Sequence, residues 1–240
     1  MLVRITLNRP EKRNALDRET ILRIRAELRS APAGARAILL SGEGADFCSG
    51  GDLSELQRIR DASSLENLED ARILGELFVE MRRHALPIIG AVRGRAFAGG
   101  CGLATACDII LASDTAQFAY PEVKLGFVPA MVMAILRRQV SEKIAFELLT
   151  TGRVLTATEA LACGLVNAVY PSGEFDARVE SYASEMAARS ASAVRLTKSL
   201  LYHMDGMGFE AAIEAGAQIN AIARNTPDCR QGIDRFLKKG

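Results

Sequence analysis

Apolar residues along the chain form short, nearly continuous runs that alternate with longer stretches of helical spacing. The runs at residues 2–8, 35–41 and 88–92 predict buried strands, and the stretch 70–84 predicts an amphipathic helix. Because strands alternate with helices, we expect a mostly parallel sheet with crossover connections. The same half of the chain is expected to contain helices at 17–29, 53–60 and 100–107, strands at 108–112 and 117–119, and a polar, mobile segment at 61–67.

The pattern becomes predominantly helical after Ser141, with one short strand expected at 166–170. Residues 1–190 are expected to form the core, and residues 191–240 a C-terminal helical region. The helices expected in this half lie at 174–189, 192–203, 209–223 and 228–238.

The charge balance argues against a general nucleic-acid or membrane-surface role, since 30 basic residues face 29 acidic ones. No apolar run approaches about 18 residues, so no transmembrane helix is expected. The N-terminus begins directly in a strand pattern without a signal-peptide pattern, and we expect a cytoplasmic protein.

The five cysteines include no C-x-x-C pair and read as small buried side chains in a reducing compartment. Two histidines lie far apart in the sequence, at 84 and 203. This distribution predicts no zinc site.

Two glycine-rich turns carry the most specific chemistry, at 47–52 (Phe-Cys-Ser-Gly-Gly-Asp) and 97–102 (Phe-Ala-Gly-Gly-Cys-Gly). Each closely follows a predicted strand and precedes a predicted helix. Glycine permits a sharp turn and close approach of another molecule to peptide N–H groups, which are unpaired where a helix begins. One such turn is commonly only a tight connection. Two brought together would aim two donors at one oxygen atom, as in an oxyanion hole.

The order and spacing of several further motifs resemble the enoyl-CoA hydratase/isomerase (crotonase) family over nearly the whole chain. The resemblance rests on the two turns and on the segments at 5–16 (ITLNRPEKRNAL), 108–112 (DIILA), 117–122 (QFAYPE), 125–129 (LGFVP), 151–153 (TGR) and 157–166 (ATEALACGLV).

The resemblance implies an α/β fold, a spiral of ββα units, with a C-terminal helical region that packs in a homotrimer or a dimer of trimers. No sequence repeat shows the spiral directly. Family members usually carry an additional N-terminal strand, so we expect a short or truncated first hairpin. The implied substrate is an acyl-CoA thioester, with no cofactor beyond the coenzyme A that the substrate carries.

The same resemblance assigns the catalytic groups. The backbone N–H groups of Gly51 and Gly99 match the oxyanion donors, and Glu122 matches a catalytic carboxylate. Taken alone, Glu122 after Pro121 fits an acidic residue in the first turn of a helix. Family hydratases carry a second glutamate, at the position where this chain has Gly102.

An apolar surrounding would raise the pKa of Glu122. Four residues could supply this apolar surrounding: Val128, Met131, Val132 and Met133. They would then line a dry, narrow pocket that also includes Gly102 and Pro121. The alternative is that they simply fill the core-facing side of a helix. The residues that match the family's coenzyme A contacts are Arg9, Lys12, Arg13, Ala15, Asp52 and Leu53. Without the resemblance, the basic residues among them would be assigned to an ordinary solvated turn. Lys238 and Lys239 fit either a contact with the coenzyme A phosphates or a charged chain end.

A single carboxylate suffices to move a proton between two carbons on one face, whereas syn addition of water is easiest with two. The favoured reaction is therefore Δ3-to-Δ2 enoyl-CoA isomerisation by Glu122, and hydration of a 2-enoyl-CoA is the alternative. An RNA-binding or catalytically inactive member of the family is a further alternative. Nucleotide-binding and serine-hydrolase functions are poorly supported, because the chain has no G-x-x-x-x-G-K-[ST] or G-x-G-x-x-G motif and no suitable histidine.

Overall fold

A five-stranded parallel sheet forms the centre of the computed structural model, which describes residues 1–238 and omits the side chains of residues 53–56. The strand order is β1-β2-β3-β5-β8, so the crossover connections predicted from the sequence are present. The edge strand β1 pairs with β2 in parallel register from Leu2↔Ala37 to Leu7↔Gly42. The strands are β1 (Leu2–Leu7), β2 (Ala37–Gly42), β3 (Ile88–Val92), β5 (Ile109–Ser113) and β8 (Ala168–Tyr170).

Helices cover both faces of this sheet, which explains why its strands read as continuous apolar runs. Ile38 and Leu40 of β2 point into the larger core, beneath α1 (Arg18–Arg29) and α3 (Ser64–Arg83). Leu39 points the other way, into a smaller cluster covered by α8 (Phe175–Ala188).

A second, three-stranded sheet in the order β4-β6-β7 was only partly expected, since the sequence predicts β6 alone. Its strands are β4 (Arg95–Phe97), β6 (Gln117–Ala119) and β7 (Val154–Thr156). The second glycine turn is therefore entered from β4 rather than directly from β3. Strands of three residues are too short to show a period, which is why β4 and β7 escaped prediction.

The segment 61–67 is not the mobile connection that its polarity suggested. α2 (Leu53–Asp61) ends at its start, and α3 begins at Ser64, six residues before the predicted start at 70. Ser63 accepts a hydrogen bond from the N–H of Glu66, and the Glu66 carboxylate accepts one from the N–H of Ser63. This capping box fixes the start of the helix.

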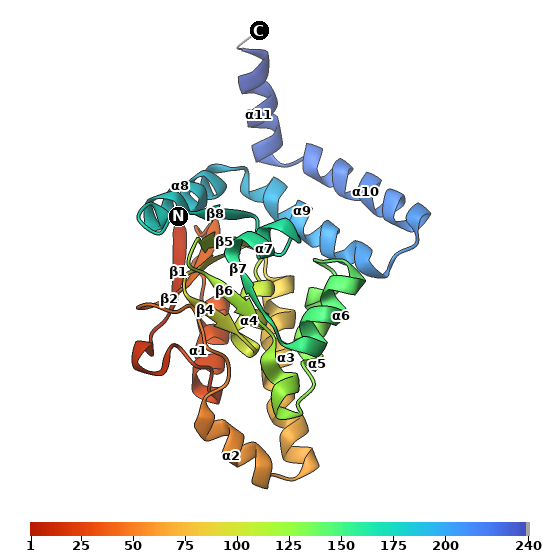
Figure 1. Cartoon of the computed structure of the whole chain (residues 1–240). Coiled ribbons are helices and arrows are strands. Elements are labelled where there is room, and N and C mark those ends of the chain that lie inside the picture. Colours follow the sequence, from red (N-terminus) through yellow and green to blue (C-terminus); the bar gives the residue numbers. More distant parts are fainter. Residues whose placement is uncertain (239–240) are drawn as a thin grey trace.

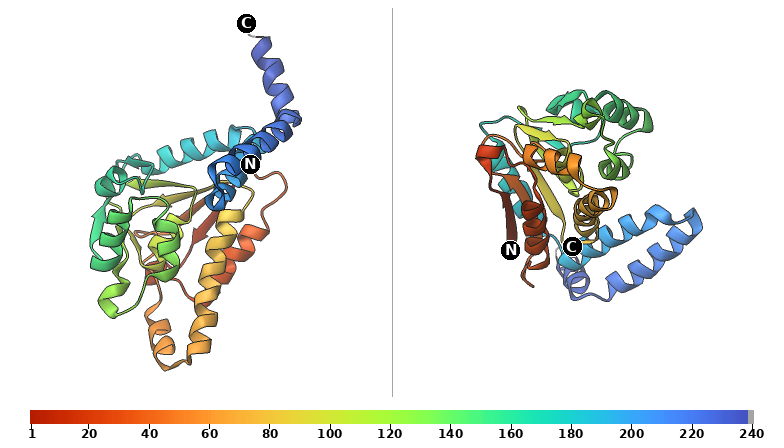
Figure 2. Two further views of the ribbon diagram at one scale, coloured as in Figure 1. Left: turned by 90° about the vertical axis from the view of Figure 1, so that its right-hand side faces the viewer. Right: turned by 90° about the horizontal axis from the view of Figure 1, so that it is seen from below.

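The remaining helical elements lie around the two sheets, and α9, α10 and α11 follow one another at the C-terminal end (Figure 1). Figure 1 and the left view of Figure 2 show α11 projecting from the body. These elements are η1 (Pro10–Lys12), α4 (Gly99–Thr105), η2 (Pro121–Leu125), α5 (Ala130–Leu136), α6 (Glu142–Thr151), α7 (Ala157–Ala162), α9 (Ala191–His203), η3 (Met204–Gly206), α10 (Phe209–Arg224) and α11 (Pro227–Leu237). Among the described residues, no helix is long and apolar enough to span a membrane.

Candidate active site

The two glycine turns pack directly against one another. The N–H of Phe97 donates to the carbonyl of Cys48 at 3.0 Å, and the N–H of Cys48 donates to the carbonyl of Arg95 at 2.9 Å. Gly100 lies so close to Cys48 that an added Cβ would be 2.6 Å from its Sγ atom. The close approach requires glycine here, and it brings the predicted donor turns together.

Neither donor N–H, that of Gly51 or that of Gly99, is used by an acceptor within the described chain. The carbonyl of Ala98 accepts a hydrogen bond from the N–H of Gly102 at 3.0 Å. C=O and N–H point in opposite directions across a trans peptide, so the Gly99 N–H is directed away from α4. It is therefore free to meet an oxygen atom outside the helix.

Apolar side chains border the second turn. A Cβ added at Gly99 would lie 3.6 Å from Cδ1 of Leu16 and 3.7 Å from Cδ2 of Leu74, whereas one at Gly51 would meet nothing within 4 Å. Gly99 does not have a positive φ; the residue that does is Ala98. A side chain at Gly99 would therefore meet crowding by Leu16 and Leu74 but no penalty from a left-handed backbone.

Glu122 leaves the same sheet edge as Gly99. β4 and β6 run in parallel with Phe97 opposite Ala119, and the N–H of Ala98 donates to the carbonyl of Ala119 at 2.9 Å. The half-buried Pro121 then opens η2, which carries Glu122 in its first turn. The pairing of β4 with β6 thus places the carboxylate and the Gly99 donor on neighbouring chain segments.

The Glu122 carboxylate is unusual because its Oε2 atom is buried without a hydrogen-bond partner in the described part of the chain. Burial raises the pKa of Glu122 above its ordinary value of 4.5, and a hydrogen bond from its own N–H opposes this rise. Beneath it, the buried Tyr120 hydroxyl lies 2.6 Å from Oγ1 of Thr105. A partly buried carboxylate that has one buried oxygen without a partner and a raised pKa is typical of a catalytic base or acid.

The space beside Gly102 is already filled. A Cβ on Gly102 would collide with Cγ1 of Val132 and lie 3.1 Å from Cζ of Phe78. Val132 belongs to α5 and is 3% exposed. The position at which family hydratases carry a second carboxylate is therefore occupied by the core, and a glutamate substituted at residue 102 would not fit without another change.

The α5 segment supplies only part of the apolar surrounding expected for Glu122. Met131 is half-buried and packs near Gly75 of α3, with Cγ 3.6 Å from an added Cβ there. Val128 is 71% exposed and Met133 is 38% exposed. Because Val128 precedes α5 in an exposed loop, it does not enclose the carboxylate within the single chain, contrary to the expectation.

The segment matched to coenzyme A is braced by Arg9. Its guanidinium pairs with Asp17 at 2.8 Å and Asp52 at 2.9 Å, and it donates to the carbonyl of the buried Ala15 at 2.8 Å. Lys12 also lies 3.5 Å from Asp52, whose side chain is 4% exposed. Arg9 and Asp52 therefore support the first glycine turn.

Asn14 completes this brace and was not assigned a role from the sequence. It is 1% exposed with φ 55°, its Oδ1 accepts from the N–H of Arg9, and its Nδ2 donates to the carbonyls of Glu43 and Asp46. An asparagine tolerates this left-handed backbone better than most residues, which is the available sequence signal.

Four other residues were considered as coenzyme A contacts. Arg13 and Lys238 are exposed, whereas Lys239 and the side chain of Leu53 fall outside the described residues.

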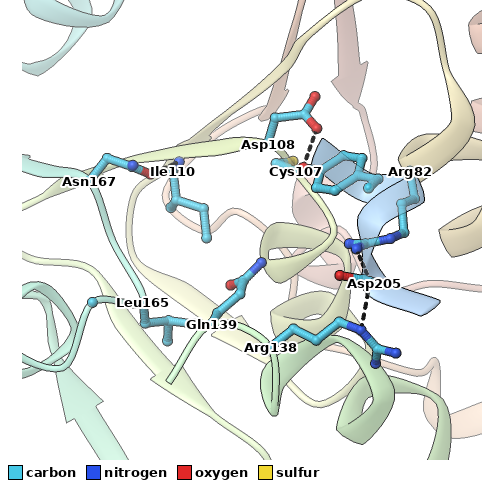
Figure 3. A pocket seen from close by; sticks show the side chains of 11 residues that line it. Arg82, Cys107, Asp108, Ile110, Arg138, Gln139, Leu165, Asn167 and Asp205 are labelled. Carbon is cyan, nitrogen blue, oxygen red and sulfur yellow. Dashed lines mark hydrogen bonds and ion pairs between the residues drawn. The ribbon is translucent and has the colours of Figure 1, made fainter. Parts of the chain in front are cut away.

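A separate polar cavity of about 270 Å³ lies on another side of the core (Figure 3). Arg82 and Arg138 share the carboxylate of Asp205, and Tyr202 donates to Asp108 at 2.6 Å. The lining includes neither glycine turn and does not include Glu122. Its charged groups are largely paired with one another, so the glycine turns remain the candidate site.

Comparison with known proteins identifies the family of the chain. The sequence profile of the family described as "Enoyl-CoA hydratase/isomerase" matches residues 1–240, and the chain belongs to that family. It is 41% identical over 237 residues to a Thermus thermophilus protein whose name assigns it to the enoyl-CoA hydratases, covering 98% of this chain and 94% of that protein.

Two further relatives support the assignment. The Escherichia coli protein named 2,3-dehydroadipyl-CoA hydratase is 31% identical, with 98% of this chain and 91% of that protein covered. The crystal structure of an enoyl-CoA hydratase from Mycobacterium smegmatis superposes with a TM-score of 0.95 at 30% identity, covering 99% of this chain and 93% of that one. The protein is thus a crotonase-fold enzyme, an enoyl-CoA hydratase or isomerase.

Proposed function

We propose that the enzyme isomerises 3-enoyl-CoA thioesters to 2-enoyl-CoA thioesters with Glu122 as its single proton shuttle. The observation that carries the proposal is the packing of Val132 against Gly102. It leaves no room for the side chain of a second carboxylate at that position unless Val132 moves.

In the proposed reaction the Glu122 carboxylate removes a proton from C2 of the substrate. The C2–H electrons form a C1=C2 bond while the carbonyl π electrons move onto the thioester oxygen, which gives a dienolate. The same carboxyl group then returns the proton to C4: the C3=C4 electrons form the new C4–H bond, the C1=C2 electrons form the C2=C3 bond, and the thioester C=O bond re-forms. In the intermediate the negative charge collects on the thioester oxygen, where the N–H groups of Gly51 and Gly99 stabilise it. The raised pKa of Glu122 makes its ionised form a stronger base.

Coenzyme A is proposed to lie along residues 9–13 and the backbone at Asp52 and Leu53. Arg13 and Lys12 are the exposed cations of this segment, so they are proposed to meet the phosphates. Arg9 is proposed to act indirectly, because its guanidinium is occupied by Asp17 and Asp52.

The decisive experiment compares kcat/KM for 3-hexenoyl-CoA and crotonyl-CoA on one preparation. The expected result is isomerisation at least about tenfold more efficient than hydration. Glu122→Gln keeps the side-chain shape and should reduce kcat about 100-fold or more while acyl-CoA binding survives. A preparation that hydrates crotonyl-CoA faster than it isomerises would contradict the proposal.

Hydration of a 2-enoyl-CoA is the second candidate, because the relatives described above are named as hydratases. It would require the water to be held by Glu122 alone or by a group other than residue 102. Rapid turnover of crotonyl-CoA would favour it.

We further propose that the chain assembles as a homotrimer or a dimer of trimers. The C-terminal helices expose large apolar side chains, which is typical of interaction surfaces. These include Leu201, Phe209, Ile213, Ile222 and Phe236, each more than 50% exposed. Sedimentation analysis of the purified protein tests this assembly.

A further inference from the structure

Ala98 has a backbone conformation that alanine rarely adopts. Its φ is 49° and its ψ is −127°, a combination that places Cβ close to the backbone and normally occurs at glycine. Residues held in such regions cost folding free energy and persist only where the surroundings impose the conformation.

The hydrogen bonds on either side of Ala98 impose it. Its N–H donates to the carbonyl of Ala119 at 2.9 Å, which ties it to β6, and its carbonyl accepts from the N–H of Gly102 at 3.0 Å, which starts α4. The preceding residue, Phe97, is tied to Cys48 of the first glycine turn. The same ψ angle sets the direction of the next N–H, that of Gly99.

The methyl group of Ala98 faces the first turn. A Cβ on Gly50 would lie 2.9 Å from Cβ of Ala98 and 2.8 Å from the carbonyl oxygen of Phe97. Gly50 has room for the methyl group because it has no side chain. Its φ of +97° is a second reason why glycine is suited to this position. Each member of this contact directly precedes an oxyanion donor: Gly50 precedes Gly51, and Ala98 precedes Gly99.

We propose that Ala98 is a positioning residue whose methyl group, seated on Gly50, fixes the separation and direction of the two donor N–H groups. The strain at Ala98 lowers stability, and the chain retains it because the methyl contact holds the oxyanion hole. The inference rests on the proposed function, since it concerns the same enolate-stabilising site.

The test is Ala98→Gly, with Ala112→Gly in β5 as the matched control. Glycine adopts the conformation without penalty, so the Tm of Ala98→Gly should rise, while kcat should fall about tenfold with KM nearly unchanged because the donors are less well fixed. Ala112 lies in β5, is paired with Val92 and Val169 and belongs to neither glycine turn, so Ala112→Gly should lower Tm and leave kcat unchanged.

A spectroscopic readout separates this inference from the proposed reaction. The absorbance of a conjugated 2,4-dienoyl-CoA shifts to longer wavelength when its thioester oxygen is polarised, so the shift reports the donors without turnover. It should be smaller in Ala98→Gly than in the parent and in Ala112→Gly.

The outcomes are distinct. If Ala98→Gly keeps the kcat and the spectral shift of the parent, Ala98 has no positioning role. If the Tm of Ala98→Gly is lower than that of the parent, the conformation of Ala98 is not strained. The parent protein could shift the dienoyl absorbance and yet isomerise no 3-enoyl-CoA. That result would overturn the proposed reaction, and the role of Ala98 would then be decided by the spectral shift alone.

Discussion

Val132 occupies the space that a side chain on Gly102 would need. The two residues come from different helices, α5 and α4, so the relationship arises from packing and not from sequence proximity. Residue 102 therefore cannot be changed alone, and the two positions should be treated as one unit.

Gly102→Glu alone should misfold locally and lower the free energy of unfolding by about 2 kcal/mol or more, because overpacking strains a filled core. Gly102→Glu with Val132→Ala should recover part of that loss and raise the ratio of crotonyl-CoA hydration to 3-hexenoyl-CoA isomerisation. Chemical denaturation and the two kcat/KM values measure both effects. A folded double variant that binds acyl-CoA but keeps the parental ratio would show that the second carboxylate does not control the reaction. Val132→Ala alone is the control for loss of the valine side chain.

The burial of Glu122 should make stability depend on pH. Its folded-state pKa is raised above the ordinary value of 4.5, so the folded protein holds the proton more tightly than the unfolded chain. The parent should therefore lose stability as pH rises from below 4.5 through the raised folded-state pKa. Glu122→Gln should have the higher Tm near pH 7, and the difference should vanish below about pH 4.5.

Thermal unfolding of both proteins across pH 4–8 measures this difference. Glu214→Gln, on an exposed helix, is the control for loss of a surface charge. A Glu122→Gln variant less stable than the parent at pH 7 would indicate that the carboxylate has a stabilising partner.

Lys198 anchors α9 to the core through a buried ion pair. Its Nζ donates to Asp108 at 2.7 Å and to the carbonyls of Met81 and Leu86, and the side chain is 7% exposed. Lys198→Met should lower the free energy of unfolding by about 3 kcal/mol, because it leaves the Asp108 carboxylate buried without its cation. Adding Asp108→Asn should restore part of the loss. A single variant as stable as the parent would mean that α9 is held by apolar packing alone.

Ile213 provides a test of the proposed assembly. It is 60% exposed on α10, one helical turn after Phe209. Ile213→Glu should shift the protein towards monomers in sedimentation analysis, because a charge would be buried in the interface. Gln57→Glu adds the same charge at an exposed polar position of α2, outside the C-terminal helices, and should leave the assembly unchanged. Equal masses for both variants would place the interface elsewhere.

The alternation of apolar runs and helical stretches was sufficient to predict the parallel sheet, because strands covered on both faces carry an unmistakable signal. The start of α3 was recoverable as well, since Ser63 and Glu66 spell a capping box within a segment that looked merely polar. The short strands β4 and β7 were not recoverable, because three residues form a strand only when a neighbour already pairs with them.

At the site, the glycine turns predicted that two chain segments would meet, and the packing of Gly100 against Cys48 bears this out. Glu122 was recognised through the family resemblance, whereas its unpaired Oε2 atom depends on tertiary burial. The strain at Ala98 left no mark in the sequence, because alanine is ordinarily found in helices and strands.

The brace formed by Arg9 and Asn14 has a kinetic consequence. Together they close hydrogen bonds to the backbone at Ala15, Glu43 and Asp46, and every partner in these bonds belongs to the chain itself. A surface that is already ordered loses little conformational entropy when a nucleotide-bearing ligand arrives. Coenzyme A derivatives should therefore associate in a single concentration-dependent phase, with no slow isomerisation of the protein limiting the rate.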